Sequence, residues 1–208
     1  MIDRARELRE FWFGRLPLGA PELRERMQFW FGAEETAEAR RERDQKLRAR
    51  FGALVIEAAA GKLAAWADSP RRRLSLILLL DQLPRNLYRD TPRAFATDAQ
   101  ALALSLSGIQ SGADAALDVV ERIFFYMPLQ HAESQDVQEE SVAAYRRLVA
   151  ECPADLRTLF EESLESARSH RELIKQFGRF PHRNRVLGRA STAAEEIWLR
   201  ANPDRFGQ

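Results

Sequence analysis

The segment RRRLSLILLLDQL (71–83) constrains the fold more than any other, because after its basic first turn it is apolar on every side. A helix of this kind has no face suited to water, so it has to lie in the middle of the structure with other helices around it. Ser69 and Pro70 fit the start of this helix as its N-cap and first helical residue. Pro84 predicts its end, since the residue before a proline is disfavoured in α geometry.

Helical periodicity also dominates the rest of the chain, and no alternating strand or hairpin pattern stands out. Two pairs are spaced as capping boxes, Asp118 with Glu121 and Thr192 with Glu195, and each marks a helix start. We expect an all-α protein of about eight to ten helices that forms a single domain over 1–208, since no linker divides the chain. The further helices are predicted at about 4–14, 21–32, 35–60, 94–108, 118–127, 135–151, 154–177 and 191–201.

Two near copies of the sequence FWFG end the first two predicted helices, at 11–14 and 29–32. Each has a glycine where a helix C′ residue belongs. The aromatic side chains before the glycine fit either the core or a contact between two copies of the chain, and both possibilities stay open. No repeat of fixed period continues through the chain.

Composition narrows the classes of function. The 32 basic and 31 acidic side chains leave a net charge of +1, which makes nucleic-acid binding an unfavoured function. No apolar stretch approaches the roughly 20 residues of a transmembrane helix and no signal peptide is visible, so we expect a cytoplasmic protein without membrane contact. The single cysteine, Cys152, fits a reducing compartment. The Walker, G-x-G-x-x-G and G-x-S-x-G motifs are absent, so we expect no cofactor.

Three predicted loops carry aromatic, histidine, arginine and carboxylate side chains, where connecting segments usually have small polar ones. They span 84–92, 128–134 and 177–189, and the three histidines of the chain fall in or beside them. Loops of this composition are candidates for a functional site.

Before the first loop, Asp81 lies on the apolar stripe of the central helix. A buried carboxylate needs a partner, and Arg85 follows four residues later. Asp98 is expected to pair in the same way with Arg89 or Arg93. These pairs also fit a structural ion-pair network that holds the turn in place.

In the second loop, His131 and Glu133 follow a helix that Pro128 is expected to end. A histidine and a carboxylate this close together can act as a general base and the group that orients it, or as two metal ligands. They can equally bond to nearby helix ends. Neither H-x-x-x-H nor H-E-x-x-H is present, so we expect no metal site.

In the third loop, His182, Arg183 and Asn184 follow a proline and can present several hydrogen-bond donors to an anion. Arg179 belongs to a basic stripe on the preceding helix, which is typical of a solvated face. His170 lies on the apolar side of that helix, so we expect a core histidine there.

The segments LLDQLPRNLYRDTPRAFATDAQAL (79–102), ERIFFYMPLQHAESQDVQ (121–138) and FGRFPHRNRVLGRASTAAEE (177–196), with FWFG near the start, resemble the bacterial domain-of-unknown-function family 924. The resemblance runs over nearly the whole chain. It implies a right-handed α-α superhelix related to tetratricopeptide folds, although the sequence has no repeat signature of its own. It implies no particular activity.

The loop residues predict a small-molecule site, binding or enzymatic, where the segments 81–98, 126–138 and 177–189 converge on a pocket. Its ligand would be a small anionic metabolite that carries a phosphate or carboxylate group. The candidate catalytic residues are His131, Glu133, His182 and Asp81, and the candidate ligand-binding residues are Arg85, Arg89, Asp98, Tyr126, Gln138, Arg179, Arg183 and Asn184.

Two other functions compete with this one. A superhelical fold offers a concave face for a peptide, so the chain could be a scaffold without catalytic activity that binds a protein partner or a second copy of itself. The loop residues could also serve only to satisfy buried charges and helix ends. We favour the small-molecule site, because no fold requires histidine, arginine and asparagine together in one loop.

Overall fold

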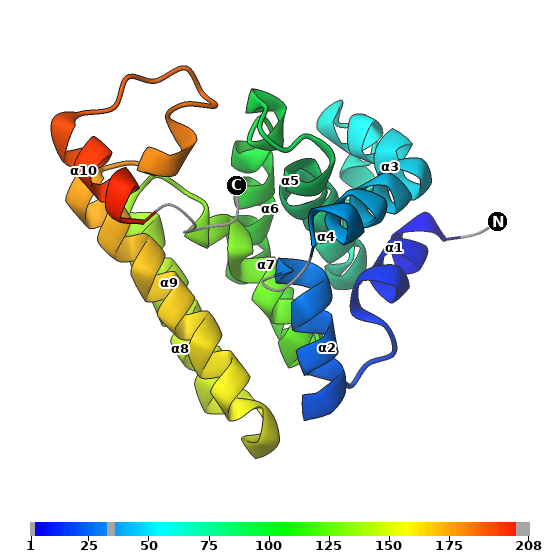
Figure 1. The fold of residues 1–208 in the computed structure, drawn as a ribbon. Coiled ribbons are helices and arrows are strands. Elements are labelled where there is room, and N and C mark those ends of the chain that lie inside the picture. Colours follow the sequence, from blue (N-terminus) through cyan, green and yellow to red (C-terminus); the bar gives the residue numbers. More distant parts are fainter. Residues whose placement is uncertain (1–2, 33–35, 203–208) are drawn as a thin grey trace.

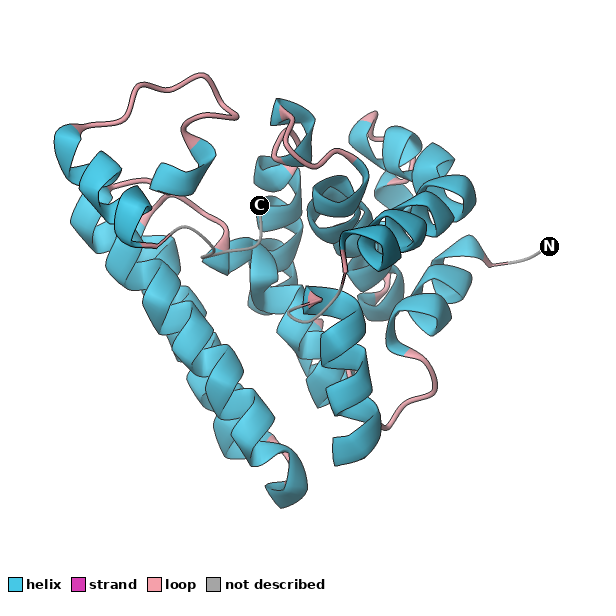
Figure 2. Cartoon of the chain, viewed as in Figure 1, coloured by secondary structure: helices cyan, strands magenta, loops and turns pink. Residues whose placement is uncertain are grey.

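The computed structural model describes residues 3–32 and 36–202. Within these ranges the chain forms helices and loops and no β-strand, which confirms the all-α prediction (Figure 1 and Figure 2). None of the helices described is long and apolar enough to cross a membrane. A repeating superhelix stays a prediction.

The α-helices are α1 (Arg4–Phe13), α2 (Ala20–Phe31), α3 (Ala37–Ala59), α4 (Pro70–Ile77), α5 (Leu83–Leu87), α6 (Asp98–Gln110), α7 (Val119–Gln130), α8 (Gln135–Glu151), α9 (Arg157–Phe177) and α10 (Ala193–Ala201). Shorter elements are the 3-10 turns η1 (Ala64–Asp68), η3 (Pro92–Ala94), η4 (Asp114–Ala116), η5 (Ala154–Leu156) and η6 (Pro181–Arg183), and the π-helical η2 (Leu78–Gln82).

Most of the predicted helices are confirmed, with ends that differ by a few residues. Both capping boxes are present, at the starts of α7 and α10. Ser69 is the N-cap of α4 and Pro70 its first residue. Gly14 and Gly32 end α1 and α2 with φ angles of 76° and 54°, a conformation that glycine adopts without strain. The predicted start of α3, Glu35, lies outside the described residues.

The apolar helix lies in the middle of the structure, as predicted. α4, η2 and α5 follow one another directly, and together they contact α1, α3, α6 and α7. The side chains from 74 to 80 are almost fully buried. The predicted end at Pro84 is wrong. The helix continues to Leu87 by widening into a π turn, in which the Leu83 N–H donates to the carbonyl of Leu78.

The π turn accommodates Pro84, which has no N–H to donate. In a regular helix that N–H would bond to the carbonyl of Leu80, so this carbonyl needs another donor. The Thr97 hydroxyl supplies one at 2.5 Å. Arg85 Nη1 donates to the next carbonyl, that of Asp81, at 2.7 Å. The side chains of Thr97 and Arg85 therefore hold the helix together across the proline.

Pro128 also lies inside a helix, so the predicted end of α7 at this residue is wrong. α7 continues to Gln130, with His131 as its C-cap. Hydroxyl groups of α6 and α8, from Ser105 and Tyr145, donate to the carbonyls three and five residues before the proline, at 2.6 and 2.7 Å. Donors from neighbouring helices again support a helix that local sequence would end.

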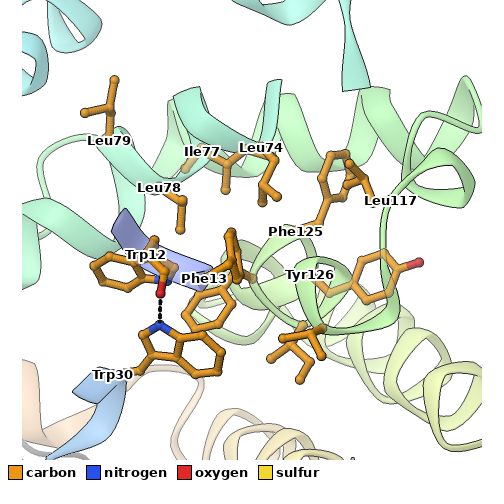
Figure 3. Close-up of a cluster of buried hydrophobic side chains, with 14 of the residues drawn as sticks. Trp12, Phe13, Trp30, Leu74, Ile77, Leu78, Leu79, Leu117, Phe125 and Tyr126 are labelled. Carbon is orange, nitrogen blue, oxygen red and sulfur yellow. Dashed lines mark hydrogen bonds between the residues drawn. The ribbon is translucent and has the colours of Figure 1, made fainter. Parts of the chain in front are cut away.

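An aromatic cluster joins α1, α2 and α7 in the core (Figure 3). Its central ring is Phe124, with ring centroids 5.4 Å from Phe13 and 4.6 Å from Trp30. The Trp30 indole N–H donates to the carbonyl of Trp12 at 3.0 Å, the dashed bond in Figure 3. The two FWFG segments thus pack against each other in the core, apart from Phe31, which is 46% exposed.

α8 and α9 form a long antiparallel pair that contacts α7 (Figure 1). After α9 the chain turns back through η6 to α10. Arg183 of η6 lies 3.3 Å from Asp98, so this returning segment reaches the start of α6. A second, small apolar cluster supports the segment and consists of Leu173, Ile174 and Phe180, with Phe177 and Trp198 packed against it.

Gly108 in α6 provides a test of how tightly the helices pack. A Cβ at this position would lie 2.4 Å from a ring carbon of Phe125. We expect Gly108→Ala to lower the free energy of unfolding by about 1–2 kcal/mol, because overpacking outweighs the gain in helix propensity. Urea denaturation followed by circular dichroism measures the change.

Gly52→Ala in α3 is the matched control, because a Cβ there would meet its two nearest neighbours at 3.7 and 3.9 Å, which is ordinary contact. We expect it to raise the free energy of unfolding by up to about 1 kcal/mol. An equal effect of the two substitutions would contradict the close approach of α6 and α7 at Gly108.

Candidate functional site

A cavity of about 330 Å³ lies among the central helix, the ends of α2 and α7, and parts of α3, α9 and η6. We call it the His–Arg cavity after its basic lining residues. These are Arg40, Arg43, Arg85, Arg89 and Arg183, with His131, His170 and His182.

Apart from Met127, the remaining lining is polar or aromatic, and none of the described lining residues is acidic. Trp30 and Phe31 extend the aromatic cluster of the core to the cavity wall. Arginine and histidine without a carboxylate among them make a surface suited to an anion.

The Asp81 carboxylate lies behind this lining and has no exposed surface. It accepts hydrogen bonds from the Gln82 amide at 2.6 Å and from His131 Nδ1 at 2.7 Å, and Arg85 Nη1 lies 3.2 Å from the same carboxylate. Burial alone would raise the pKa of the Asp81 carboxyl, but Arg85 and His131 outweigh burial and hold that pKa well below its usual range. The predicted pairing of Asp81 with Arg85 is confirmed.

The ionised Asp81 fixes the tautomer of His131. A carboxylate only accepts hydrogen bonds, so Nδ1 of the imidazole carries the hydrogen and Nε2 has the lone pair. Burial and the positive charge of Arg85 lower the pKa of His131, so the ring is neutral at pH 7. Of the possibilities left open for His131, a pairing with Glu133 is not the one found, because Asp81 holds the ring instead.

His170, expected in the core, is half-buried and lines the cavity. Its Nδ1 lies 2.8 Å from the carbonyl oxygen of Ser166, so this nitrogen also carries the hydrogen. The ring centroid lies 6.3 Å from that of His131 and 5.5 Å from that of Phe180. Burial lowers the pKa of His170 to about 3. Burial and the neighbouring arginine of η6 likewise lower the pKa of His182 to about 3.

Asp98 connects two arginines of the cavity. Arg85 donates to both carboxylate oxygens of Asp98 at 2.9 Å, and Arg183 Nη1 lies 3.3 Å from one of them. The predicted pairing of Asp98 with Arg89 or Arg93 is wrong, because the turn after α5 carries Arg89 to α3, where it donates to a carboxylate at 2.7 Å. Asp98 thus orients guanidinium groups from two distant segments.

Two aromatic rings hold Arg183 in place. Its guanidinium carbon lies 4.7 Å from the ring centroids of both Phe95 and Phe180. The residue is 6% exposed, and its Nε has no hydrogen-bond partner among the described residues. Burial and the charge of Arg85 lower the pKa of Arg183 to about 10, so it stays positive at neutral pH. A buried cation with an unused donor is well suited to an anionic ligand.

Three predicted site residues do not line the His–Arg cavity and instead hold the segment that carries η6. Glu133 accepts two hydrogen bonds from Arg189 at 2.7 and 3.0 Å, and Arg189 Nε donates to Asn184 at 2.9 Å. Arg179 donates to both carboxylate oxygens of Glu195 at 2.7 and 2.8 Å. Glu133, Asn184 and Arg179 therefore position His182 and Arg183 from outside the cavity.

Tyr126 and Gln138 do not line the cavity either. Both are fully buried. The Tyr126 hydroxyl donates to the carboxylate of Asp114 in η4 and accepts a hydrogen bond from Arg122, one turn earlier in α7. The Gln138 amide donates to three carbonyls at the end of α7, at 3.2, 2.7 and 2.8 Å, so it completes the helix end beside His131.

Several lining residues were not predicted. Arg40 and Arg43 belong to the charged run ARRERD, which reads as the exposed face of a helix. Grouping the three histidines of the chain would have added His170, because all three line this cavity. No local signal marks the other polar lining residues, which are Gln82, Asn86, Gln130 and Ser166.

Two further cavities differ in character. One of about 780 Å³ beside α1 is lined by charges of both signs, such as the ion pair of Arg9 and Glu121 at 2.7 Å, and by none of the predicted site residues. One of about 490 Å³ shares Phe95, His131 and Arg183 with the His–Arg cavity. In the part of the chain that the structure describes, no group of three or more His, Cys, Asp or Glu residues is placed to hold a metal ion.

The buried Asp81 is testable by isosteric replacement. We expect Asp81→Asn to lower the free energy of unfolding by about 3 kcal/mol, because Arg85 loses a buried counter-ion. Urea denaturation at pH 7 measures the change. Asp90→Asn is the control, because Asp90 forms a surface pair with Arg185 at 3.2 Å and its side chain is 63% exposed. A loss as small as that of the control would show that Asp81 is not ionised in the folded protein.

Comparisons with known proteins agree with this fold. The structure of a protein of unknown function from Agrobacterium tumefaciens is 30% identical to this chain, with a TM-score of 0.76, and the match covers 95% of this chain and 97% of that one. No curated protein matches the chain. The family described as "Bacterial protein of unknown function (DUF924)" matches residues 8–203, which confirms the resemblance seen in the sequence. Because the match extends over nearly the whole chain, this protein belongs to the DUF924 family of bacterial proteins of unknown function.

Proposed function

We propose that the His–Arg cavity binds a small metabolite that carries a phosphate or carboxylate group. The observation that supports this is the lining itself, which combines five arginines and three histidines with no acidic side chain among the described lining residues. These basic groups come from separate parts of the chain, and Asp81, which holds Arg85 and His131, is fully buried behind the lining. Its volume of about 330 Å³ is that of a small-molecule site.

In this proposal Arg85 and Arg183 are the groups that hold the anion. Both guanidinium groups are buried and both contact Asp98, which limits the directions in which they can donate. A planar guanidinium that is already oriented loses little side-chain entropy when it binds an oxyanion in a bidentate way. The rings of Trp30 and Phe95 give the rest of the ligand an apolar surface.

The same proposal gives His131 the role of proton acceptor. Asp81 fixes its Nδ1–H, so Nε2 is the basic nitrogen that a ligand would meet. An oriented imidazole beside an anion-binding site is an arrangement that supports proton transfer between the ring and the bound molecule. His131 is therefore the first residue to substitute once a ligand is known.

A thermal-shift screen against phosphorylated metabolites, organic acids and inorganic oxyanions tests the binding proposal. A ligand at 100 times its dissociation constant stabilises by about 2.7 kcal/mol, or roughly 5–11 °C for a chain of this length. We expect such a shift for at least one oxyanion, and a smaller one at high ionic strength because chloride screens the arginines. No shift across the panel would contradict the proposal.

For a ligand found in this way, we expect Arg183→Gln to weaken binding at least tenfold, as measured by isothermal titration calorimetry. The loss of one buried charge-assisted hydrogen bond is worth about 1.5–3 kcal/mol. Arg185→Gln is the matched control, because this arginine is two residues later, 81% exposed in its side chain and outside the cavity lining. Equal losses in the two variants would place the anion on the surface, and circular dichroism confirms that both variants are folded.

A further inference from the structure

The three histidines of the chain all line one cavity, although they lie in three separate segments. His131 is at the end of α7, His170 is in α9 and His182 is in η6. Arginine alone is enough to hold an anion by charge. A cluster of imidazoles adds a property that arginine lacks, because an imidazole gains and loses a proton near neutral pH.

The hydrogen bonds of two of these imidazoles fix where their hydrogens are. His131 Nδ1 meets the Asp81 carboxylate at 2.7 Å, and His170 Nδ1 meets the Ser166 carbonyl at 2.8 Å. Both partners only accept hydrogen bonds, so in the neutral rings both Nδ1 atoms carry hydrogen and both Nε2 atoms are acceptors.

An oxyanion also has only acceptors, so it repels an imidazole nitrogen that carries a lone pair. A hydrogen bond between the two needs one additional proton on Nε2. Once that proton is present, the contact becomes a charge-assisted hydrogen bond, about twice as strong as a neutral one. For His131, the resulting imidazolium is also stabilised by the ionised Asp81 behind it.

We propose that an oxyanion enters the His–Arg cavity together with one proton, which binds to Nε2 of either His131 or His170. This inference rests on the proposed anion binding and narrows the ligand class. It favours a group that is still doubly charged at neutral pH, such as a phosphate monoester or a dicarboxylate, because this charge offsets a new imidazolium beside the arginines. A monocarboxylate provides half of that charge.

The surroundings of the pair agree with this inference. Without a ligand, burial and the nearby arginines keep the pKa of both rings below their ordinary value, so both are neutral. A new negative charge in the cavity acts in the opposite direction and raises the pKa of the two imidazoles. The basic groups that face the pair are Arg40 and Arg43 of α3, Arg85 of α5, Arg89 after α5, and His182 and Arg183 of η6. The acidic groups that face it are Asp81 of η2, Asp98 of α6 and Glu133 after α7.

The direction of the pH dependence follows from linkage. The complex holds one more proton than the free protein and free ligand, so affinity rises as pH falls. Between the pKa of the free pair and that of the complex, we expect the association constant to change about tenfold per pH unit.

Inorganic sulfate is a suitable probe, because it stays doubly charged over the whole working range and any proton taken up belongs to the protein. Isothermal titration calorimetry at one pH and ionic strength, in buffers of different ionisation enthalpy, gives the number of protons bound per sulfate. We expect close to one proton at pH 7 for the natural sequence.

Two substitutions locate the proton. Glutamine has a side-chain N–H but does not titrate, so His170→Gln and His131→Gln should each still bind sulfate while the proton uptake falls by about half or more. His170 is half-buried and supports no buried carboxylate, so its variant remains informative if His131→Gln is unstable. Arg185→Gln, outside the cavity, should leave proton uptake unchanged.

The outcomes separate the two proposals. No sulfate binding between pH 5.5 and 8 would overturn the anion site itself. Sulfate binding without proton uptake would leave the anion site in place and overturn the coupled proton. Full proton uptake in both glutamine variants would also overturn it, because the proton would then belong to another group.

Discussion

The buried carboxylate of Asp81 is the group on which the rest of the site depends. It has no contact with water, so its charge has to be balanced by groups that the fold brings to it. Arg85 and Gln82 come from the same helix, and His131 comes from the end of α7. Arg85 also pairs with Asp98, and Asp98 in turn contacts Arg183 of η6, so a chain of ion pairs leads from Asp81 to η6. One ionised group therefore joins segments that are far apart in the chain.

The position of Asp81 depends in turn on how the central helix passes a proline. In a regular helix the ring of Pro84 would clash with the carbonyl of Leu80, and the hydrogen-bond spacing of this helix widens at 78–82, just before the proline. The freed carbonyl of Leu80 is satisfied by Thr97, one residue before α6 and Asp98. The π turn at 78–82 and the ion pairs of Asp98 are thus connected through Thr97.

Interactions between residues close together in the sequence could be predicted, whereas those between residues far apart in the sequence could not. Helix starts, capping boxes and the ion pair of Asp81 with Arg85 depend on residues within one turn, so they could be predicted. The helices through both prolines could not, because the hydroxyl groups that donate to their carbonyls, such as that of Thr97, come from other segments of the chain. The bond from His131 to Asp81 spans 50 residues and the contact of Arg183 with Asp98 spans 85, and no spacing rule gives either.

The segment that carries His182 and Arg183 has a consequence for how the molecule unfolds. It packs on its own small apolar cluster and meets the main core through charged and aromatic contacts around Asp98 and Glu133. A ligand that touches both Arg85 and Arg183 would act as a non-covalent cross-link between these two parts. Occupancy would then make hydrogen exchange in η6 as slow as in the central helix, and the two parts would open as one cooperative unit.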